Sequence, residues 1–481
     1  MVGRKHEIEE LNKLYNSGKA ELVAIYGRRQ IGKTYIVDET FKNKITFRHA
    51  GLSPVEANNM KVSILKKQLE HFYFSLQLQG MPKSHRPESW LEAFFMLEKL
   101  LESKDNDERQ VVFLDELPWM DTPQSGFITA FEGCWNTWAC HRANLLVVVC
   151  GSANSWILDK LINNHGGLYN RVTYEIKLSP FTLGECKEFF KSMNIVISDY
   201  DITQSYMILG GVPYYLEYFE RGVSLTQTVY KLFFQPNAKL RDEYNRLFES
   251  GFSNPEIMKN LIKFLSKRNA GYTIKEITEG LSITDGGYLS KSLKALITSD
   301  FIIEYIPFGL GKRDVHYKLV DPFCKFCLKF VNDKNSLDEA FWQQNVTSSS
   351  INSWRDFAFE NVFFNHINQI KAALGISGVI TTHSAWSKRP VEKDEAGAQI
   401  DLIISRKDNV VNMCEIKFFS SDYAVDKAYH STLIERQKLL STLIPTKSVV
   451  HGTLITTFNL TYNEYSSDFV KVINLGDLFK E

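Results

Sequence analysis

The sequence predicts an α/β protein whose N-terminal part is a three-layer, mostly parallel sheet. Two observations support this prediction. Apolar runs of strand length alternate with helical patterns over residues 1–190, and such alternation is typical of βαβ units. Residues 27–34 also read G-x-x-x-x-G-K-T between an apolar run and a helical segment, which is where phosphate-binding loops occur.

Length and charge limit the functions that the chain can have. A chain of 481 residues is expected to form two to four domains. Lys plus Arg and Asp plus Glu both number 56, so no global positive field attracts nucleic acid. Contact with nucleic acid would therefore depend on local basic patches.

The ends and the cysteines predict a cytoplasmic protein without a membrane partner. The charged start has no apolar signal region, and the longest apolar stretch, 145–150, is too short to cross a bilayer. The seven cysteines are scattered and odd in number, as in a reducing compartment. Cys324 and Cys327 have C-x-x-C spacing, but we expect them to be buried helix residues because no second pair lies near them in the sequence.

Five segments are expected along the chain. Strands are predicted at 21–26, 45–50, 110–114 and 144–150, with a weaker one at 173–178, and helices around 56–78, 89–103 and 127–138. Residues 195–245 read as helical. Three helices (257–265, one from 273, and 288–297) and a hairpin (301–306 and 315–319) predict a winged helix. The expected segments are 1–194, a nucleotide-binding core; 195–252, a helical lid; 253–332, the winged helix; 333–352, a polar linker; and 353–481, another α/β unit.

The loop at 27–34 predicts a site for ATP or GTP. Its N–H groups and the following helix N-terminus would hold phosphates. Lys33 would contact the β- and γ-phosphates, and the Thr34 hydroxyl would bind Mg²⁺. The expected nucleotide-binding residues of this region are Gly27, Arg28, Arg29, Gln30, Ile31, Gly32, Lys33, Thr34 and Tyr35.

Acidic and polar residues follow two further predicted strands. Asp115 would complete the Mg²⁺ shell, and Glu116 would polarise the attacking water. Ser152, or as a second choice Asn154, would sense the γ-phosphate; either could instead be a helix N-cap. Arg171 is a candidate arginine finger, in cis or from a neighbouring copy, or else a structural arginine.

These motifs, in this order, resemble the archaeal-type ATPase family of the AAA+/STAND group. The motifs are Val2-Gly3-Arg4, the loop at 27–34, Leu114-Asp115-Glu116, Gly151-Ser152, Leu168-Tyr169-Asn170-Arg171 and Gly210-Gly211-Val212-Pro213. The resemblance implies a P-loop NTPase fold with a helical lid. It places Val2, Gly3 and Arg4 near adenine, which favours ATP, and Pro213 in the lid against the base. Asn170 departs from the family's usual Gly.

The predicted winged helix is a candidate nucleic-acid contact. Tyr288, Ser290, Lys291 and Lys294 could face a major groove, and Lys312 and Arg313 at the hairpin tip could touch phosphates. The alternative is a protein-interaction module or spacer, because the basic patch is small.

The C-terminal unit has acids and a lysine in a pattern suited to phosphodiester cleavage. Glu360 falls on a predicted helix, Asp401 on a strand, and Glu415 and Lys417 on one face of the next strand. The acids would bind Mg²⁺ and Lys417 would position the water. The pattern resembles the PD-(D/E)xK nuclease superfamily, which implies a restriction-endonuclease-like fold, with Gln437 as an auxiliary position.

Three functions remain open from the sequence. The leading one is an ATPase whose nucleotide state controls a Mg²⁺-dependent nuclease domain acting on DNA. The alternative is a STAND-like regulator whose inactive C-terminal fold binds nucleic acid or a protein partner, and a chaperone-like ATPase is a weaker third option. A homo-oligomer is compatible with each.

Overall fold

A computed structural model describes residues 2–53, 63–152, 155–163, 166–252, 254–284, 286–311, 313–332, 339–388 and 398–480. The chain divides into two compact units, and each is described by itself. The first comprises 1–179, 249–253 and 294–300, and the second comprises 180–248, 254–293 and 301–481.

The first unit is built on a five-stranded parallel sheet of order β2-β3-β4-β1-β5. The strands confirm the predicted segments; they are β1 (Glu21–Gly27), β2 (Ile45–Ala50), β3 (Gln110–Asp115), β4 (Leu145–Ser152) and β5 (Tyr174–Lys177). β3 and β4 are buried along their whole length, which explains their continuous apolar sequences.

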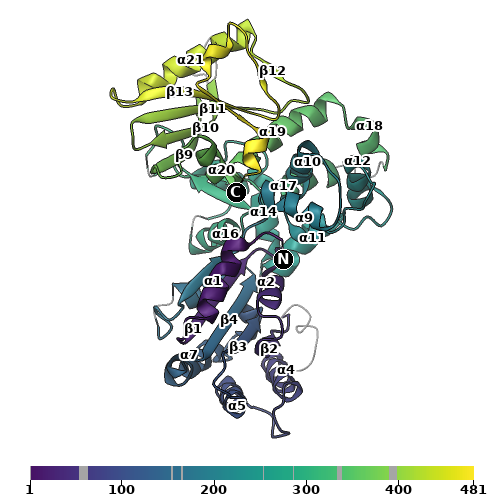
Figure 1. Ribbon diagram of the computed structural model, residues 1–481, viewed down its shortest axis with the longest axis vertical. Coiled ribbons are helices and arrows are strands. Elements are labelled where there is room, and N and C mark those ends of the chain that lie inside the picture. Colours follow the sequence, from purple (N-terminus) through teal and green to yellow (C-terminus); the bar gives the residue numbers. More distant parts are fainter. Residues whose placement is uncertain are drawn as a thin grey trace. The chain divides into compact units, whose positions relative to one another are not determined.

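Helices cover both faces of this sheet (Figure 1). On one face α1 (Lys5–Tyr15) and α2 (Lys33–Thr40) pack in a cluster that includes Leu11 and Ile36. On the other face a larger cluster includes Phe72, Trp90 and Phe127, from α4 (Ile64–Leu78), α5 (Trp90–Ser103) and α7 (Phe127–Thr137). The predicted three-layer arrangement is thereby confirmed; of the helix predicted at 56–78, residues 56–62 lie outside the described residues.

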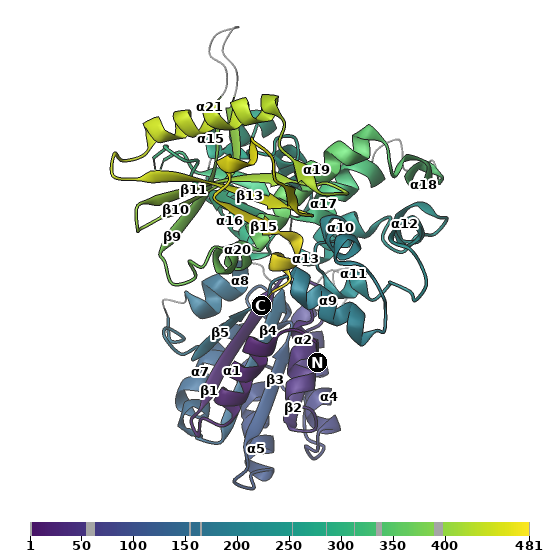
Figure 2. The same ribbon diagram turned by 45° about the horizontal axis from the view of Figure 1, so that its top comes forward.

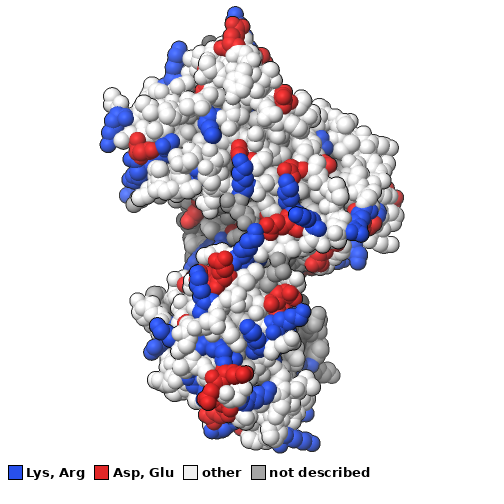
Figure 3. All heavy atoms as spheres, viewed as in Figure 1, with Lys and Arg blue, Asp and Glu red and all other residues white. Residues whose placement is uncertain are grey.

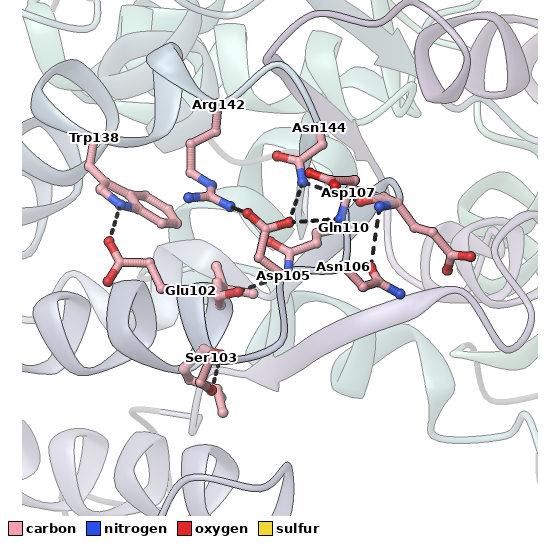
Figure 4. Close-up of polar contacts among 12 residues, drawn as sticks. Glu102, Ser103, Asp105, Asn106, Asp107, Gln110, Trp138, Arg142 and Asn144 are labelled. Atoms are coloured by element: carbon pink, nitrogen blue, oxygen red, sulfur yellow. Dashed lines mark hydrogen bonds and ion pairs between the residues drawn. The ribbon is translucent and has the colours of Figure 1, made fainter.

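The loops that enter β3 and β4 are tied together by polar contacts (Figure 4). The Asp105 carboxylate accepts hydrogen bonds from Arg142 and from Asn144 Nδ2, the latter at 2.8 Å. Trp138 Nε1 donates to Glu102 at 3.0 Å. These contacts fix the edge where both strands begin and leave the opposite edge, where they end, for ligands.

The second unit opens with α9 (Leu183–Ser192), which precedes the segment predicted as helical, 195–245. The helices of that segment are α10 (Asp199–Leu209), α11 (Pro213–Leu216), α12 (Leu225–Val229), the π-helical turn η3 (Tyr230–Phe234) and α13, which begins within it (Glu243–Gly251). Thr182 begins α9 with a capping box completed by Glu185. Within this unit α10 packs against α17 (Pro322–Phe326) and α19 (Ser349–Asn365).

The segment predicted as a winged helix contains the expected helices and hairpin. They are α14 (Pro255–Leu265), α15 (Ile274–Leu281), α16 (Gly287–Thr298), and β7 (Ile302–Tyr305) with β8 (His316–Leu319). A short β6 (Tyr272–Thr273) completes an antiparallel sheet of order β6-β8-β7. Arg313 is exposed near the hairpin tip, whereas Lys312 lies outside the described residues.

The segment predicted as a polar linker is more structured than expected. Its described part includes α18 (Phe341–Asn345), and α19 begins at Ser349 rather than after 352. Trp342 is buried, with its ring centroid 5.3 Å from Phe326 and 5.8 Å from Phe330. Aromatic packing therefore outweighs the polar composition of this segment.

The C-terminal strands form a mixed sheet of order β15-β13-β11-β10-β9. They are β9 (Thr381–Lys388), β10 (Ala398–Arg406), β11 (Val410–Lys417), β13 (Val449–Thr456) and β15 (Lys471–Asn474). α21 (Lys427–Leu443) lies along one face (Figure 2) and buries Leu433 and Leu440 there. The other described elements are α20 (Ile367–Ala373), the two-strand pair β12 (Tyr423–Ala424) and β14 (Leu460–Thr461), and α22 (Leu475–Leu478).

Two predictions on the surface and the cysteines can be compared with this fold. Acidic and basic side chains are interspersed on the face shown in Figure 3, in line with the balanced charge. Cys324 and Cys327 are buried in α17 and the following π-helical turn η4 (Cys327–Val331), as predicted. In the part of the chain that the structure describes, no helix is long and apolar enough to cross a membrane.

Candidate functional site

The phosphate-loop sequence forms a tight turn between β1 and α2. Gln30 and Gly32 adopt positive φ values of 67° and 88°, which wrap the backbone into a concave loop. Gly27 is required by space, because a Cβ there would lie 2.2 Å from the Leu178 carbonyl oxygen and 2.5 Å from the Ile31 side chain. The loop thus has the backbone shape that phosphate cradles use.

Lys33 lies inside this loop. It is 6% exposed, and its Nζ donates to the carbonyl oxygens of Gly27 at 3.1 Å and Arg28 at 2.8 Å. Burial lowers the pKa of Lys33, opposed by the charges of Glu116 and Asp115. An anion in the loop would compensate the desolvation of the ammonium group.

Thr34 and Asp115 meet at the edge of the sheet, as the parallel topology predicts. The Thr34 hydroxyl donates to Asp115 Oδ2 at 2.7 Å, although 81 positions separate them. A hydroxyl and a carboxylate are oxygen ligands of the kind that Mg²⁺ prefers, so this pair fits the metal that accompanies nucleotide phosphates.

Glu116 is held by Ser152 from the neighbouring strand. Glu116 has a left-handed backbone, with φ 45°, which turns its side chain at the strand end. The Ser152 hydroxyl lies 3.1 Å from both carboxylate oxygens, and its N–H donates at 3.3 Å. Gly151 permits this approach, because a Cβ there would lie 2.7 Å from Pro118. The predicted sensor and the predicted base are therefore direct neighbours.

The N-terminal residues reach the loop through Arg4. Its guanidinium donates to the carbonyl oxygens of Ile31 at 3.4 Å and Ser179 at 2.5 Å, and the side chain is 7% exposed. Gly3 is buried and Val2 half-buried beside it in the sequence. The structure thus brings Arg4 to the loop, and the position of Val2, Gly3 and Arg4 near adenine stays a prediction.

The other residues predicted to contact the nucleotide differ in their exposure and in their hydrogen-bond partners. Arg28 is buried, Arg29 lies over the Trp119 ring at 5.5 Å and donates to Ser250 at 2.8 Å, and Tyr35 is 57% exposed. Arg171 is exposed, and its backbone N–H donates to Leu168. Asn154 lies outside the described residues, and Pro213 begins α11 in the second unit.

One predicted groove contact of the winged helix is already engaged. Lys294 Nζ donates to Asp159 at 2.9 Å, so this lysine serves an ion pair in the structure. Tyr288 is 51% exposed, and Ser290 and Lys291 are also exposed. These three keep their interpretation as candidate contacts.

The four predicted C-terminal residues line one cavity of about 510 Å³ in the second unit. They are Glu360 of α19, Asp401 of β10, and Glu415 and Lys417 of β11. Burial and the charge of Asp401 raise the pKa of Glu360 to about 7. Burial and the charge of Glu415 raise the pKa of Asp401 to about 6. The sequence therefore located a real concentration of buried acids.

Two of these acids bind cationic and hydrogen-bonding side chains that the sequence analysis missed. Arg436 Nη1 lies 2.7 and 2.8 Å from the two oxygens of Glu415, and the Tyr429 hydroxyl donates to it at 2.6 Å. Asn269 Nδ2 donates to Glu360 at 2.5 Å, and Lys318 is close enough to lower the pKa of Glu360. No spacing in the sequence connects these partners to the acids they bind.

This arrangement does not fit the predicted Mg²⁺ site. Glu415 is 0% exposed, and both its oxygens are bound by a guanidinium, so its charge is already compensated. Lys417 Nζ lies over the Tyr429 ring at 4.5 Å. Among the described residues, no three His, Cys, Asp or Glu side chains form a group that could hold a metal ion. The prediction of Asp401 and Glu415 as paired ligands is therefore at odds with this geometry.

Comparisons with known proteins agree with the site of the first unit. Residues 1–219 match the model of a family described as an ATPase domain predominantly from Archaea. This part of the chain is an archaeal-type ATPase domain. An uncharacterized protein of Methanocaldococcus jannaschii is 24% identical over 444 residues, covering 91% of this chain and 92% of the relative. An uncharacterized ATP-binding protein of the same organism is 44% identical over 43 residues, which are 9% of this chain and 73% of that protein.

Two solved structures similar to the chain come from Pyrococcus abyssi and Aeropyrum pernix. The Walker-type ATPase of Pyrococcus abyssi is 17% identical, with TM-score 0.48, covering 68% of this chain and 96% of that one. The ORC2 protein of Aeropyrum pernix, in ADPNP and ADP complexes, is 13% identical, with TM-score 0.39, covering 72% and 96%. The assignment of the archaeal-type ATPase domain depends on the family match and on the loop, sheet order and acids described above.

Proposed function

We propose that the chain binds ATP with Mg²⁺ at the loop 27–34 and hydrolyses it. The observation that carries this proposal is the convergence of Lys33, Thr34, Asp115 and Glu116 at one edge of the parallel sheet. Lys33 would bind the β- and γ-phosphates, and Arg4 would support the loop beside the base. Mg²⁺, when bound, would be held by Thr34 and Asp115 and would neutralise charge on the phosphate oxygens.

Glu116 is proposed as the group that accepts the proton of the attacking water. A carboxylate held by a neutral hydroxyl is oriented without a direct ion pair, which leaves it able to accept a proton. Ser152 would hold that carboxylate in place and connect its orientation to the phosphate. Arg171 remains a proposal for a finger acting from a neighbouring copy, because its exposed position suits contact in trans.

Two variants test this assignment by ATP turnover and nucleotide binding. Lys33→Ala is expected to abolish the stabilisation of the protein by ATP. Glu116→Gln is expected to retain bound ATP and to lower turnover by about a hundredfold or more. Lys42→Ala, an exposed lysine at the end of the same region, is the matched control and should leave both unchanged. Wild-type turnover in Glu116→Gln would refute the base assignment.

We further propose that the nucleotide state controls a C-terminal part that binds nucleic acid or a protein partner. The ion pair between Glu415 and Arg436 favours this role over metal-dependent cleavage of DNA. Incubation with supercoiled or single-stranded DNA, with Mg²⁺ or Mn²⁺ and with or without ATP, tests it, and we expect no cleavage. Cleavage that is lost in Asp401→Ala and Lys417→Ala would instead establish the nuclease.

A further inference from the structure

A second cavity of the C-terminal part has no role in the functions above. It has a volume of about 440 Å³ and lies entirely within the second unit, between α14, the α17–η4 segment and α19. This is the size of a small-ligand site. Its lining is basic and aromatic, with Lys267, Lys325, Lys329, Trp354 and Phe357, and none of its described lining residues is acidic.

The aromatic wall is formed by one face of α19. Trp354 is 8% exposed and is fixed edge-on by Phe326 and Phe330, at centroid distances of 5.6 and 5.3 Å. Phe357, one turn further along, is 54% exposed. An exposed phenylalanine above a fixed tryptophan offers a surface on which a planar ring can stack.

The basic wall faces it from a different helix. Lys325 donates to Asn269 Oδ1 at 2.9 Å, and burial together with the charge of Lys318 lowers the pKa of Lys325 well below its usual value. An anion in the cavity would favour its charged form. Lys267 and Lys329 are exposed at the rim, where phosphate groups could meet them without crossing a buried region.

The cavity adjoins the acidic residues described above. Asn269 lines it and also lines a small cavity of about 40 Å³ that contains Glu360 and Asp401. The same Asn269 bonds Lys325 through its oxygen and Glu360 through its amide nitrogen. One side chain therefore links the lysines of one cavity to the acids of the other.

We propose that this cavity, the lysine–aromatic cavity, binds one nucleotide of a nucleic-acid single strand. Its lysines would hold the phosphate and Phe357 would stack on the base, which is how proteins bind single strands without reading their sequence. The exposed lysines and Phe357 leave the rim open, so that a strand can continue beyond the bound nucleotide. The proposal rests on the binding role proposed for the C-terminal part and is independent of ATP hydrolysis.

The test is fluorescence anisotropy of the full-length protein with a short fluorescein-labelled oligothymidylate. Lys329→Glu combined with Phe357→Ala should weaken binding by about tenfold or more. The matched control is Lys99→Glu with Phe95→Ala, an exposed lysine–phenylalanine pair on α5 with Nζ 5.4 Å from the ring centroid; it should bind as the wild type does.

Three results would overturn the proposal. The first is no binding of the oligonucleotide by the wild type, and the second is unchanged affinity in the cavity variant. The third is full competition by thymidine monophosphate at the same nucleotide concentration, because such competition would make the occupant a free nucleotide. ATP turnover measured on the same samples reports folding of the first unit, and hydrogen exchange of the α17 and α19 amides reports folding of the second unit, which holds the cavity. Turnover also separates the two proposals, because the cavity variant should keep wild-type turnover and Lys33→Ala should keep wild-type binding of the oligonucleotide when ATP is absent.

Discussion

The ion pair between Arg436 and Glu415 gives the sharpest test of the C-terminal geometry. The side chain of Glu415 is 0% exposed and that of Arg436 is 20% exposed, and the shortest N–O distance is 2.7 Å. Opposite charges about 4 Å apart attract by about 4 kcal/mol at an effective dielectric constant of 20. Removal of one partner of such a buried pair leaves an unpaired charge and costs about 3–5 kcal/mol.

We therefore expect Arg436→Met to destabilise the C-terminal sheet by about 3 kcal/mol, the low end of that range, because Arg436 is partly exposed. Glu415→Gln added to Arg436→Met should recover most of this loss, since no charge then remains unpaired and Tyr429 can still donate to the amide oxygen. Arg406→Met is the control, because Arg406 pairs with Asp408, whose side chain is 42% exposed; it should cost less than about 1 kcal/mol.

Hydrogen exchange of the β11 and α21 amides is the suitable assay, because it reports local stability in a chain of several units. A loss of about 3 kcal/mol corresponds to exchange roughly a hundredfold faster. Wild-type exchange rates in Arg436→Met, or a double variant as unstable as the single one, would refute the description of Glu415 as a charge neutralised by Arg436.

Two further changes are predicted to affect stability. Gly211→Ala should destabilise the second unit by more than about 1 kcal/mol, because φ is 65° there and a Cβ would lie 2.4 Å from the Phe181 carbonyl oxygen. Gly222→Ala is the control for the backbone strain alone, because φ is 75° there and nothing lies within 4 Å of an added Cβ. Equal melting temperatures of these two variants would contradict the clash at Gly211. The hydrogen bonds of Arg268 lower the pKa of Glu276 from 4.5 to about 2. The ionised Glu276 therefore stabilises the fold fully above pH 4.5, and this contribution is lost as the pH falls toward 2. The melting temperatures of wild type and Arg268→Met should therefore converge over that interval, and a constant difference would count against this pair.

The nucleotide site was largely predictable because its geometry follows from local rules. The spacing of 27–34 fixes the loop, and the carboxyl ends of parallel strands meet at one edge. Thr34 and Asp115 therefore meet although they are far apart in sequence. The sequence did not predict the contact that holds the Glu116 carboxylate. That contact with Ser152 depends on the strand order and on the space left by Gly151.

The C-terminal site was only half predictable. The order of Glu360, Asp401, Glu415 and Lys417 correctly indicated that they share a cavity. Arg436 lies on α21 and Glu415 on β11. Tertiary packing, rather than their spacing in the sequence, sets the distance between them. The helical stretch around Trp342 was missed for a related reason, since two aromatic residues in a polar run become informative only once their packing partners are known.

The two acids that follow the buried strands show why partners decide function. Glu116 and Glu415 both stand at or near the end of a buried strand, and the sequence predicted a role in catalysis for both. Glu116 accepts hydrogen bonds from the neutral hydroxyl of Ser152, which orients the carboxylate without cancelling its charge. Glu415 is bound by the guanidinium of Arg436, which cancels the charge that a metal ion would need. A carboxylate held by a hydroxyl therefore suits the proton transfer proposed for Glu116, whereas a carboxylate bound by a guanidinium suits structural support in the C-terminal sheet.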